Sequence, residues 1–100
     1  MKEPRLTQPE IVFQALVAGS TYSHIEGCNA LHMGCYQRII SKLIHEYGIP
    51  VQSYSVKNVI NDGYHLIYYL RENVRRAIRE NNLTLYNAGE FLANPTLFTV

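Results

Sequence analysis

The sequence lacks several features that would indicate catalysis, cofactor binding or a membrane location. It has no tryptophan, and its six glycines are spread singly, so it contains no glycine-rich loop that could cradle a phosphate. Its apolar runs fall well short of the about 18–20 residues that a membrane-spanning helix needs. Residues 1–10 contain no apolar stretch of the signal-peptide kind, so we expect a cytoplasmic protein that makes no contact with a membrane.

Cysteine is scarce too, with two in the chain, and in the cytoplasm we expect both to be free thiols. Four potential metal ligands nevertheless follow one another at spacings of 4, 4 and 3 residues: His24, Cys28, His32 and Cys35. These ligand types suit zinc, but structural zinc sites usually take close ligand pairs from two segments. A helix break at Gly34 would scatter the four residues. We therefore expect no metal and no cofactor, with both cysteines packed as small apolar residues.

Charge is sparse and unevenly distributed. Charged residues make up 17% of the chain, and the formal net charge is +1. Between residues 35 and 79, seven basic residues stand against three acidic ones, which leaves an excess of four positive charges. A basic segment favours an anionic partner such as nucleic acid, although the solvated face of a helix is often basic as well.

Local signals predict one α+β domain with a single small core. Thr7 and Glu10 have the spacing of a capping box, which predicts a helix that ends at residues 18–20. A second, short helix is expected after a cap at Ser20, Thr21 or Ser23. Four residues are expected on its inner side: Ile25, Cys28, Ala30 and Leu31.

The next segment predicts an amphipathic helix followed by a hairpin. Apolar residues at helical spacing predict a helix over residues 36–47, ended by Gly48. Pro50 prevents further helix, and residues 51–56 and 64–70 have strand-like patterns. The hairpin tip, residues 57–63, contains the turn signal Asn-Asp-Gly. Helices are predicted again over residues 71–81 and from Thr84 to the break at Asn94-Pro95.

The centre of the chain has the spacing of a helix-turn-helix. Ala30 is expected where the two helices cross, Gly34 in the turn, and Ile40 in the core. Three helices followed by a hairpin is also the order of a winged helix. The segments MGCYQRIISKLIHEYGIPVQS and GYHLIYYL resemble winged helix-turn-helix proteins, particularly small DNA-binding proteins of the phage and prophage type. The resemblance covers roughly residues 8–70.

This resemblance implies a fold and a function. The fold is three helices plus a two-stranded β-hairpin wing in a domain of residues 1–82, with a C-terminal helical extension. The function is sequence-specific binding of double-stranded DNA by a transcriptional regulator, in the host cytoplasm if the protein is phage-encoded. The apolar extension, residues 83–100, is expected either to complete the core or to form a homodimer, as palindromic DNA sites require.

The candidate DNA contacts follow from the outward face of the helix at 36–47. The residues expected on it are Tyr36, Gln37, Arg38, Ser41, Lys42 and His45. Arg38 could read a guanine and Gln37 an adenine, while Ser41, Lys42 and His45 suit phosphates or base edges. On the wing, Lys57 and Asn58 would contact the backbone or the minor groove. Further along the chain, Arg75 and Arg76 would hold phosphates beside the wing or lie on a solvated face.

Two other functions compete with DNA binding. A winged helix can also serve as a protein-interaction module, here one that acts on a polymerase or replication factor of host or phage. Catalysis has little support, because Ser41 and His45 lie one turn apart with no acid placed to orient the histidine. We therefore do not expect an enzyme. The eight tyrosines could stack on bases or simply cover one face of a sheet.

Overall fold

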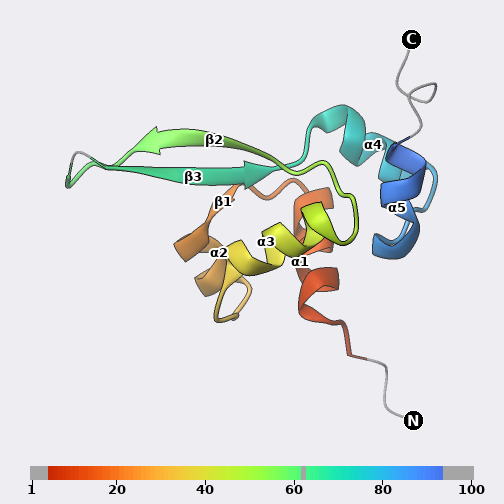
Figure 1. Ribbon diagram of the computed structural model, residues 1–100, viewed down its shortest axis with the longest axis horizontal. Helices are drawn as coiled ribbons and strands as arrows, with labels where there is room; N and C mark the ends of the chain where they lie inside the picture. The colour runs from red at the N-terminus through yellow and green to blue at the C-terminus, as the bar shows by residue number, and fades with distance from the viewer. Residues whose placement is uncertain (1–4, 62, 94–100) are drawn as a thin grey trace.

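The computed structural model describes residues 5–61 and 63–93. Over these ranges the protein is an α+β domain with five helices and a three-stranded antiparallel sheet (Figure 1). The elements in chain order are α1 Gln8–Val17, β1 Tyr22–Ser23, α2 His24–Ala30, α3 Tyr36–His45, β2 Gln52–Lys57, β3 Tyr64–Tyr69, α4 Glu72–Glu80 and α5 Leu85–Leu92. The predicted stop at Asn94-Pro95 and the apolar tail after it lie outside the described residues.

Side-chain caps start three of the helices. At α1, the Thr7 N–H donates to the Glu10 carboxylate at 3.2 Å, and the Glu10 N–H donates to the Thr7 hydroxyl at 3.4 Å, so the predicted capping box is confirmed. Of the three candidates, Ser23 is the N-cap of α2. Its side chain accepts from the Glu26 N–H, and its own N–H donates to the Glu26 carboxylate. Thr84 caps α5, as predicted. These helix starts are fixed by residues three positions apart.

The sheet contains the predicted hairpin and one further strand. β2 and β3 pair over their whole length, from Gln52 opposite Tyr69 to Lys57 opposite Tyr64. β1 adds to the other edge of β3, where it pairs only with Tyr68 and Ile67. The prediction of a two-stranded sheet missed β1, since two residues are too short for a periodic pattern. Beyond the reach of β1 the hairpin continues as an arm of two strands, which we call the distal ribbon (residues 55–61 and 63–66; Figure 1).

One core joins the helices to the base of the sheet. It includes Val12 and Leu16 of α1, Ile40 and Leu43 of α3, Tyr68 of β3, Val74 and Ile78 of α4, and Leu85 and Ala88 of α5. The α5 residues are 2% and 0% exposed, so this part of the apolar C-terminal segment completes the core of the single chain. Within the described ranges, no helix has the length and apolar character to cross a membrane.

The contact between α2 and α3 differs from the predicted helix-turn-helix spacing. Ala30 is exposed, and Ile25, expected on the inner side, is 69% exposed. The helices meet instead at Gly27, where an added Cβ would lie 2.3 Å from the Tyr36 ring. The residue with a left-handed backbone in the turn is His32 (φ 53°), not Gly34. Gly34 does lie in the turn between α2 and α3, as predicted. The prediction for Ala30 was wrong because the helices cross one helical turn earlier than the spacing implied.

Candidate nucleic-acid interface

The outer face of α3 is polar and partly basic. Five of the predicted contacts are exposed on it: Gln37, Arg38, Ser41, Lys42 and His45. The opposite face is buried through Ile39, Ile40 and Leu43, so the predicted amphipathic helix is confirmed, although it ends at His45 rather than at residue 47. Arg38, Lys42 and His45 lie at i, i+4 and i+7, which places them in one stripe along the helix.

The charges on this stripe are largely free to meet a partner. Lys42 makes a long ion pair of 3.9 Å with Glu46, and both side chains are exposed. Such pairs contribute little, so Glu46 does not hold Lys42 away from an anion. Arg38 makes no ion pair with a carboxylate in the part of the chain that the structure describes.

Tyr36 was predicted on this outer face, and that prediction is wrong. Its side chain is 0% exposed and packs edge-on between the rings of Tyr22 and Tyr68, at centroid distances of 6.3 and 6.1 Å. Burial raises the pKa of Tyr36 to about 12. The physical reason is Gly27, whose missing side chain leaves room for the ring beneath α2. Tyr36 therefore positions α3 and cannot touch a ligand outside.

The N-terminus of α3 is capped by side chains of α2. Its own N-cap residue, Cys35, makes no side-chain bond. Instead the Tyr36 N–H donates to Cys28 Sγ at 3.3 Å, and the Gln37 N–H donates to His24 Nδ1 at 3.0 Å. These bonds satisfy two of the N–H groups that every helix start leaves without a partner. They also fix the start of the candidate reading helix against α2.

The structure therefore gives two of the four residues once considered as metal ligands, His24 and Cys28, a structural role. Cys28 Sγ lies 3.8 Å from His24 Nε2, and both side chains point at the start of α3. Over residues 5–61 and 63–93, no group of three or more His, Cys, Asp or Glu is arranged to hold a metal ion.

A cleft separates the start of α3 from the underside of the distal ribbon. It has a volume of about 640 Å³ and is lined by residues of α2, α3 and β3 and by the loop after β2. Two predicted site residues, Gln37 of α3 and Asn58 of the ribbon, both line it although they are far apart in sequence. Tyr64 and His65 line the ribbon side. The fold thus brings the start of α3 and the ribbon together into one concave surface.

The ribbon side of this cleft is held by hydrogen bonds. Asn58 donates through Nδ2 to Asn61 Oδ1 at 3.0 Å, and its own Oδ1 lies 2.5 Å from His65 Nδ1. Lys57, at the end of β2, is exposed beside it. Glu26 also lines the cleft, and hydrogen bonds from the backbone and side chain of Ser23 hold the pKa of its carboxyl below the usual value. The residues that line the cleft therefore include one acid, Glu26, and no lysine or arginine.

Arg75 and Arg76 do not join this surface. Arg75 is half-buried, with its guanidinium against Gly19 in the loop after α1. Arg76 forms an exposed ion pair of 3.2 Å with Glu72. Figure 1 shows α4 at the end of the hairpin opposite to its tip. The sequence could not reveal this separation, which arises because β3 runs back to the core before α4 begins.

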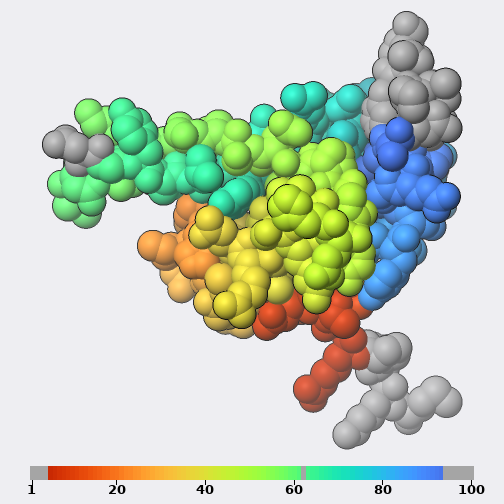
Figure 2. Space-filling view, in the orientation of Figure 1, coloured from red at the N-terminus to blue at the C-terminus, as the bar shows by residue number. Residues whose placement is uncertain are grey.

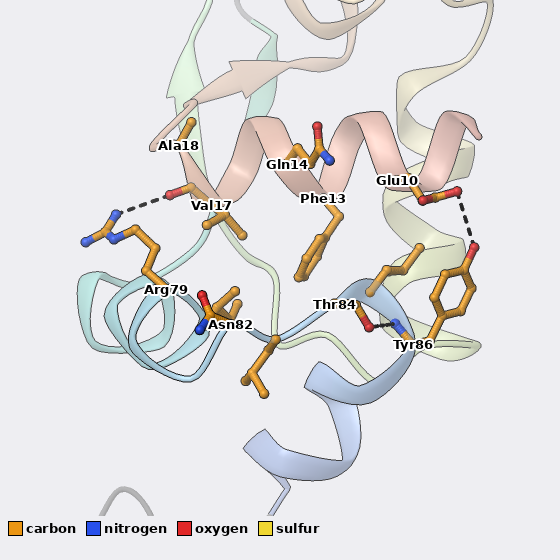
Figure 3. Close-up of a pocket in the computed structure, with 12 residues that line it drawn as sticks. Glu10, Phe13, Gln14, Val17, Ala18, Arg79, Asn82, Thr84 and Tyr86 are labelled. Carbon is orange, nitrogen blue, oxygen red and sulfur yellow. Dashed lines mark hydrogen bonds between the residues drawn. The ribbon is translucent and has the colours of Figure 1, made fainter. Parts of the chain in front are cut away.

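A second groove was missed entirely by sequence reasoning. It lies between α1, the end of α4 and the start of α5, and has a volume of about 630 Å³ (Figure 3). The Arg79 guanidinium donates to the Val17 carbonyl at 3.4 Å beside it, and the Tyr86 hydroxyl donates to Glu10 Oε1 at 3.3 Å at its other end. Phe13, Ile78 and Leu85 in its lining are at most 5% exposed, whereas Val17 and Leu83 are half-buried. Most of the surface that stays accessible in this groove is apolar.

Comparison with family models, with curated protein sequences and with solved structures gives no significant match. The function has to be inferred from the residues and their arrangement.

Proposed function

We propose that the protein is a winged helix-turn-helix protein that binds double-stranded DNA in a sequence-specific manner. The order α1, β1, α2, α3, β2, β3 supports this proposal, with α3 as the reading helix and the distal ribbon as the wing. The observation that carries it is the convergence of Gln37 and Asn58 on one cleft beside the basic stripe of α3. If α3 lies in the major groove of a duplex, the sugar–phosphate backbone of the DNA runs along this cleft.

In this proposal the residues of α3 and the wing have different tasks. Arg38 donates two hydrogen bonds to a guanine, and the Gln37 amide pairs with an adenine. Ser41, Lys42 and His45 contact phosphates or base edges further along the helix. Lys57 and Asn58 hold the backbone on the wing side. The cap from His24 and Cys28 keeps the start of α3 in place for these contacts.

We further propose that two copies bind a palindromic site and that the protein regulates transcription in the manner of phage and prophage control proteins. A two-fold dimer would place its two reading helices in major grooves about 34–36 Å apart. The described part of the C-terminal segment is used in the core of the single chain through Leu85 and Ala88. A dimer interface would therefore have to use other residues.

The test is a fluorescence-anisotropy titration of a mixed pool of duplexes at about 50 and 200 mM salt. Three cations in the proposed interface, Arg38, Lys42 and Lys57, predict a salt slope of about −2.7 per protomer, so affinity should fall about 40-fold over this range. The double variant Arg38→Ala with Lys42→Ala leaves one of these cations in the interface. It should bind much more weakly than the wild type, and its affinity should fall only about 3.5-fold between the two salt concentrations.

The matched control removes two positive charges elsewhere. Arg71→Ala with Arg76→Ala changes the net charge equally, on exposed residues of the α4 region. It should keep most of the salt slope of the wild type. Absence of wild-type binding at low salt would contradict the proposal, as would equal losses in the two double variants.

A second candidate function is a winged-helix module that binds another protein, such as a polymerase or a replication factor. Exposed apolar side chains around the cleft favour it: Ile25 is 69%, Tyr64 is 67% and Leu66 is 41% exposed. This function predicts no duplex binding at low salt. It also predicts capture of a partner that the variant Ile25→Ser with Leu66→Ser no longer holds.

A further inference from the structure

The tip of the distal ribbon carries an apolar pair with no packing partner. Val59 and Ile60 are 102% and 96% exposed, the highest values among the exposed large hydrophobic residues of the described ranges. Hairpin tips are usually built from Gly, Asn, Asp and Ser, which supply turn conformations and remain solvated. Two adjacent aliphatic side chains at such a tip gain nothing for the fold of the single chain. They call for a partner that covers them.

Asn58, Asn61 and Gly63 of the same loop are joined by hydrogen bonds. The Asn58 N–H donates to the Gly63 carbonyl at 2.9 Å, and the Gly63 N–H donates to Asn61 Oδ1 at 2.8 Å. Asn61 Oδ1 also accepts from the Asn58 amide at 3.0 Å. This network closes the loop from within and leaves Val59 and Ile60 on the outside. The apolar pair therefore stands between residues that hydrogen bonds hold together, Asn58 and Asn61, which lowers the entropic cost of inserting it into a partner.

The dimensions of the arm fit a minor groove next to the major groove that takes α3. Six residues of β2 span about 20 Å at about 3.3 Å per residue. The centre of the neighbouring minor groove lies about half a helical turn, or about 17 Å, along the duplex. Figure 2 shows the distal ribbon standing clear of the body of the molecule. Because β1 does not reach it, the arm is two strands wide, and only its tip has to enter a groove about 6 Å across.

Residues 57–63 contain one base, Lys57, and one acid, Asp62, so the tip carries no net charge in sequence. Lys57 precedes the loop and is exposed, so it could contact a phosphate beside the groove. Asn58 at the base of the loop shares a cleft with Gln37 of α3, so the arm continues the proposed DNA surface. Apolar side chains that enter a minor groove unstack a base step and bend the duplex, and the bend brings more DNA onto the protein.

We propose that Val59 and Ile60 form an apolar wedge that enters the minor groove beside α3 and kinks the bound duplex. This inference rests on the proposed DNA-binding function and adds to it a deformation of the DNA. The protein would then act on the path of the DNA as well as on its sequence. Affinity would then depend on how easily the base step entered by the two side chains unstacks. Flexible pyrimidine–purine steps would be favoured at that position.

The experiment uses the full chain and a duplex labelled at both ends for energy transfer. Val59→Ser with Ile60→Ser is compared with the wild type and with Leu6→Ser, an exposed apolar residue before α1 that is 45% exposed. The wild type and Leu6→Ser should shorten the end-to-end distance. The tip variant should leave the duplex straight and bind about tenfold more weakly, because the lost burial of two aliphatic side chains is largely offset by the unstacking cost that the variant no longer meets. Its salt slope should equal that of the wild type, since no charge has been removed.

The outcomes separate the wedge from the function on which it rests. A wild type that binds the duplex without bending it, or a tip variant that bends it as the wild type does, overturns the wedge and leaves DNA binding intact. A wild type that does not bind overturns both. Thermal unfolding of the tip variant should match that of the wild type, because neither side chain packs in the fold. If the substitutions instead abolish self-association in sedimentation and leave the bend unchanged, a second copy covers the tip and the wedge is rejected.

Discussion

The substitution Gly27→Ala should loosen the joint that holds α3 in place. Gly27 is buried in α2, and an added Cβ would lie 2.3 Å from Cγ and 2.5 Å from Cδ1 and Cδ2 of Tyr36. The ring cannot swing aside, since it is 0% exposed and packed edge-on against Tyr22 and Tyr68. Either the ring or α2 must move, and both contribute to the position of α3.

The magnitude follows from two opposing effects. Alanine in place of glycine inside a helix gains about 1 kcal/mol in helix propensity. An extra methyl group in a filled core costs about 1–3 kcal/mol, and a contact this close belongs at the upper end, about 3 kcal/mol. The free energy of unfolding should therefore fall by about 2 kcal/mol. For a domain of this size the melting temperature should fall by about 8–16 °C.

Thermal unfolding followed by circular dichroism measures this change, and Gly34→Ala is the matched control. Gly34 has no atom within 4 Å of an added Cβ and no left-handed backbone angle. Its substitution should leave the melting temperature unchanged or raise it slightly. The reasoning is refuted if Gly27→Ala is as stable as the wild type, or if Gly34→Ala loses as much stability.

Three further predictions concern the caps and the buried tyrosine. His24→Ala removes the acceptor of the Gln37 N–H and should lower the free energy of unfolding by about 0.5–2 kcal/mol in urea denaturation, whereas the exposed His45→Ala should change it little. The pKa values of Glu10 and Glu26 are lowered from 4.5 chiefly by the backbone N–H groups of Thr7 and Ser23, so the stability from these caps is present above pH 4.5 and is lost as the pH falls further. Glu10→Gln with Glu26→Gln should flatten the acid limb of the melting temperature against pH, and an unchanged limb would contradict the assignment. Burial raises the pKa of Tyr36 from 10.0 to about 12, so the stability that its neutral form contributes is present below pH 10 and is lost as the pH rises through about 12. The free energy of unfolding of Tyr36→Phe should therefore fall less steeply with pH than that of the wild type over this range. An equal slope would exclude Tyr36 as the cause.

Signals that lie within a few residues of one another predicted the structure well. The capping boxes at Thr7 and Thr84 start helices where expected, because the partners lie three positions apart on one turn. The strands on either side of residues 58–63 pair as a hairpin, because alternation and turn chemistry act locally. The exposed stripe of α3 follows from its own periodicity.

Features that depend on which surfaces meet could not be predicted in the same way. Tyr36 lies in the first turn of α3 and was predicted on its outer face. Its ring is buried in the core instead, because Gly27 of α2 has no side chain and leaves room for it. The sequence predicts Arg75 on a basic face of its helix. However, α4 packs on α1, and the Arg75 guanidinium lies against Gly19. The cap that His24 and Cys28 give to α3 joins two helices, and no spacing rule describes it.

The central claim is that the start of α3 and the distal ribbon form one DNA-binding surface. Amide chemical shifts of the isotope-labelled protein, followed by NMR while a short mixed duplex is added, test it most directly. The account predicts the largest changes at Gln37, Arg38, Lys42, Lys57 and Asn58, with small changes at Arg76 and along α5. Changes confined to the groove between α1 and α5, or no changes at low salt, would contradict it.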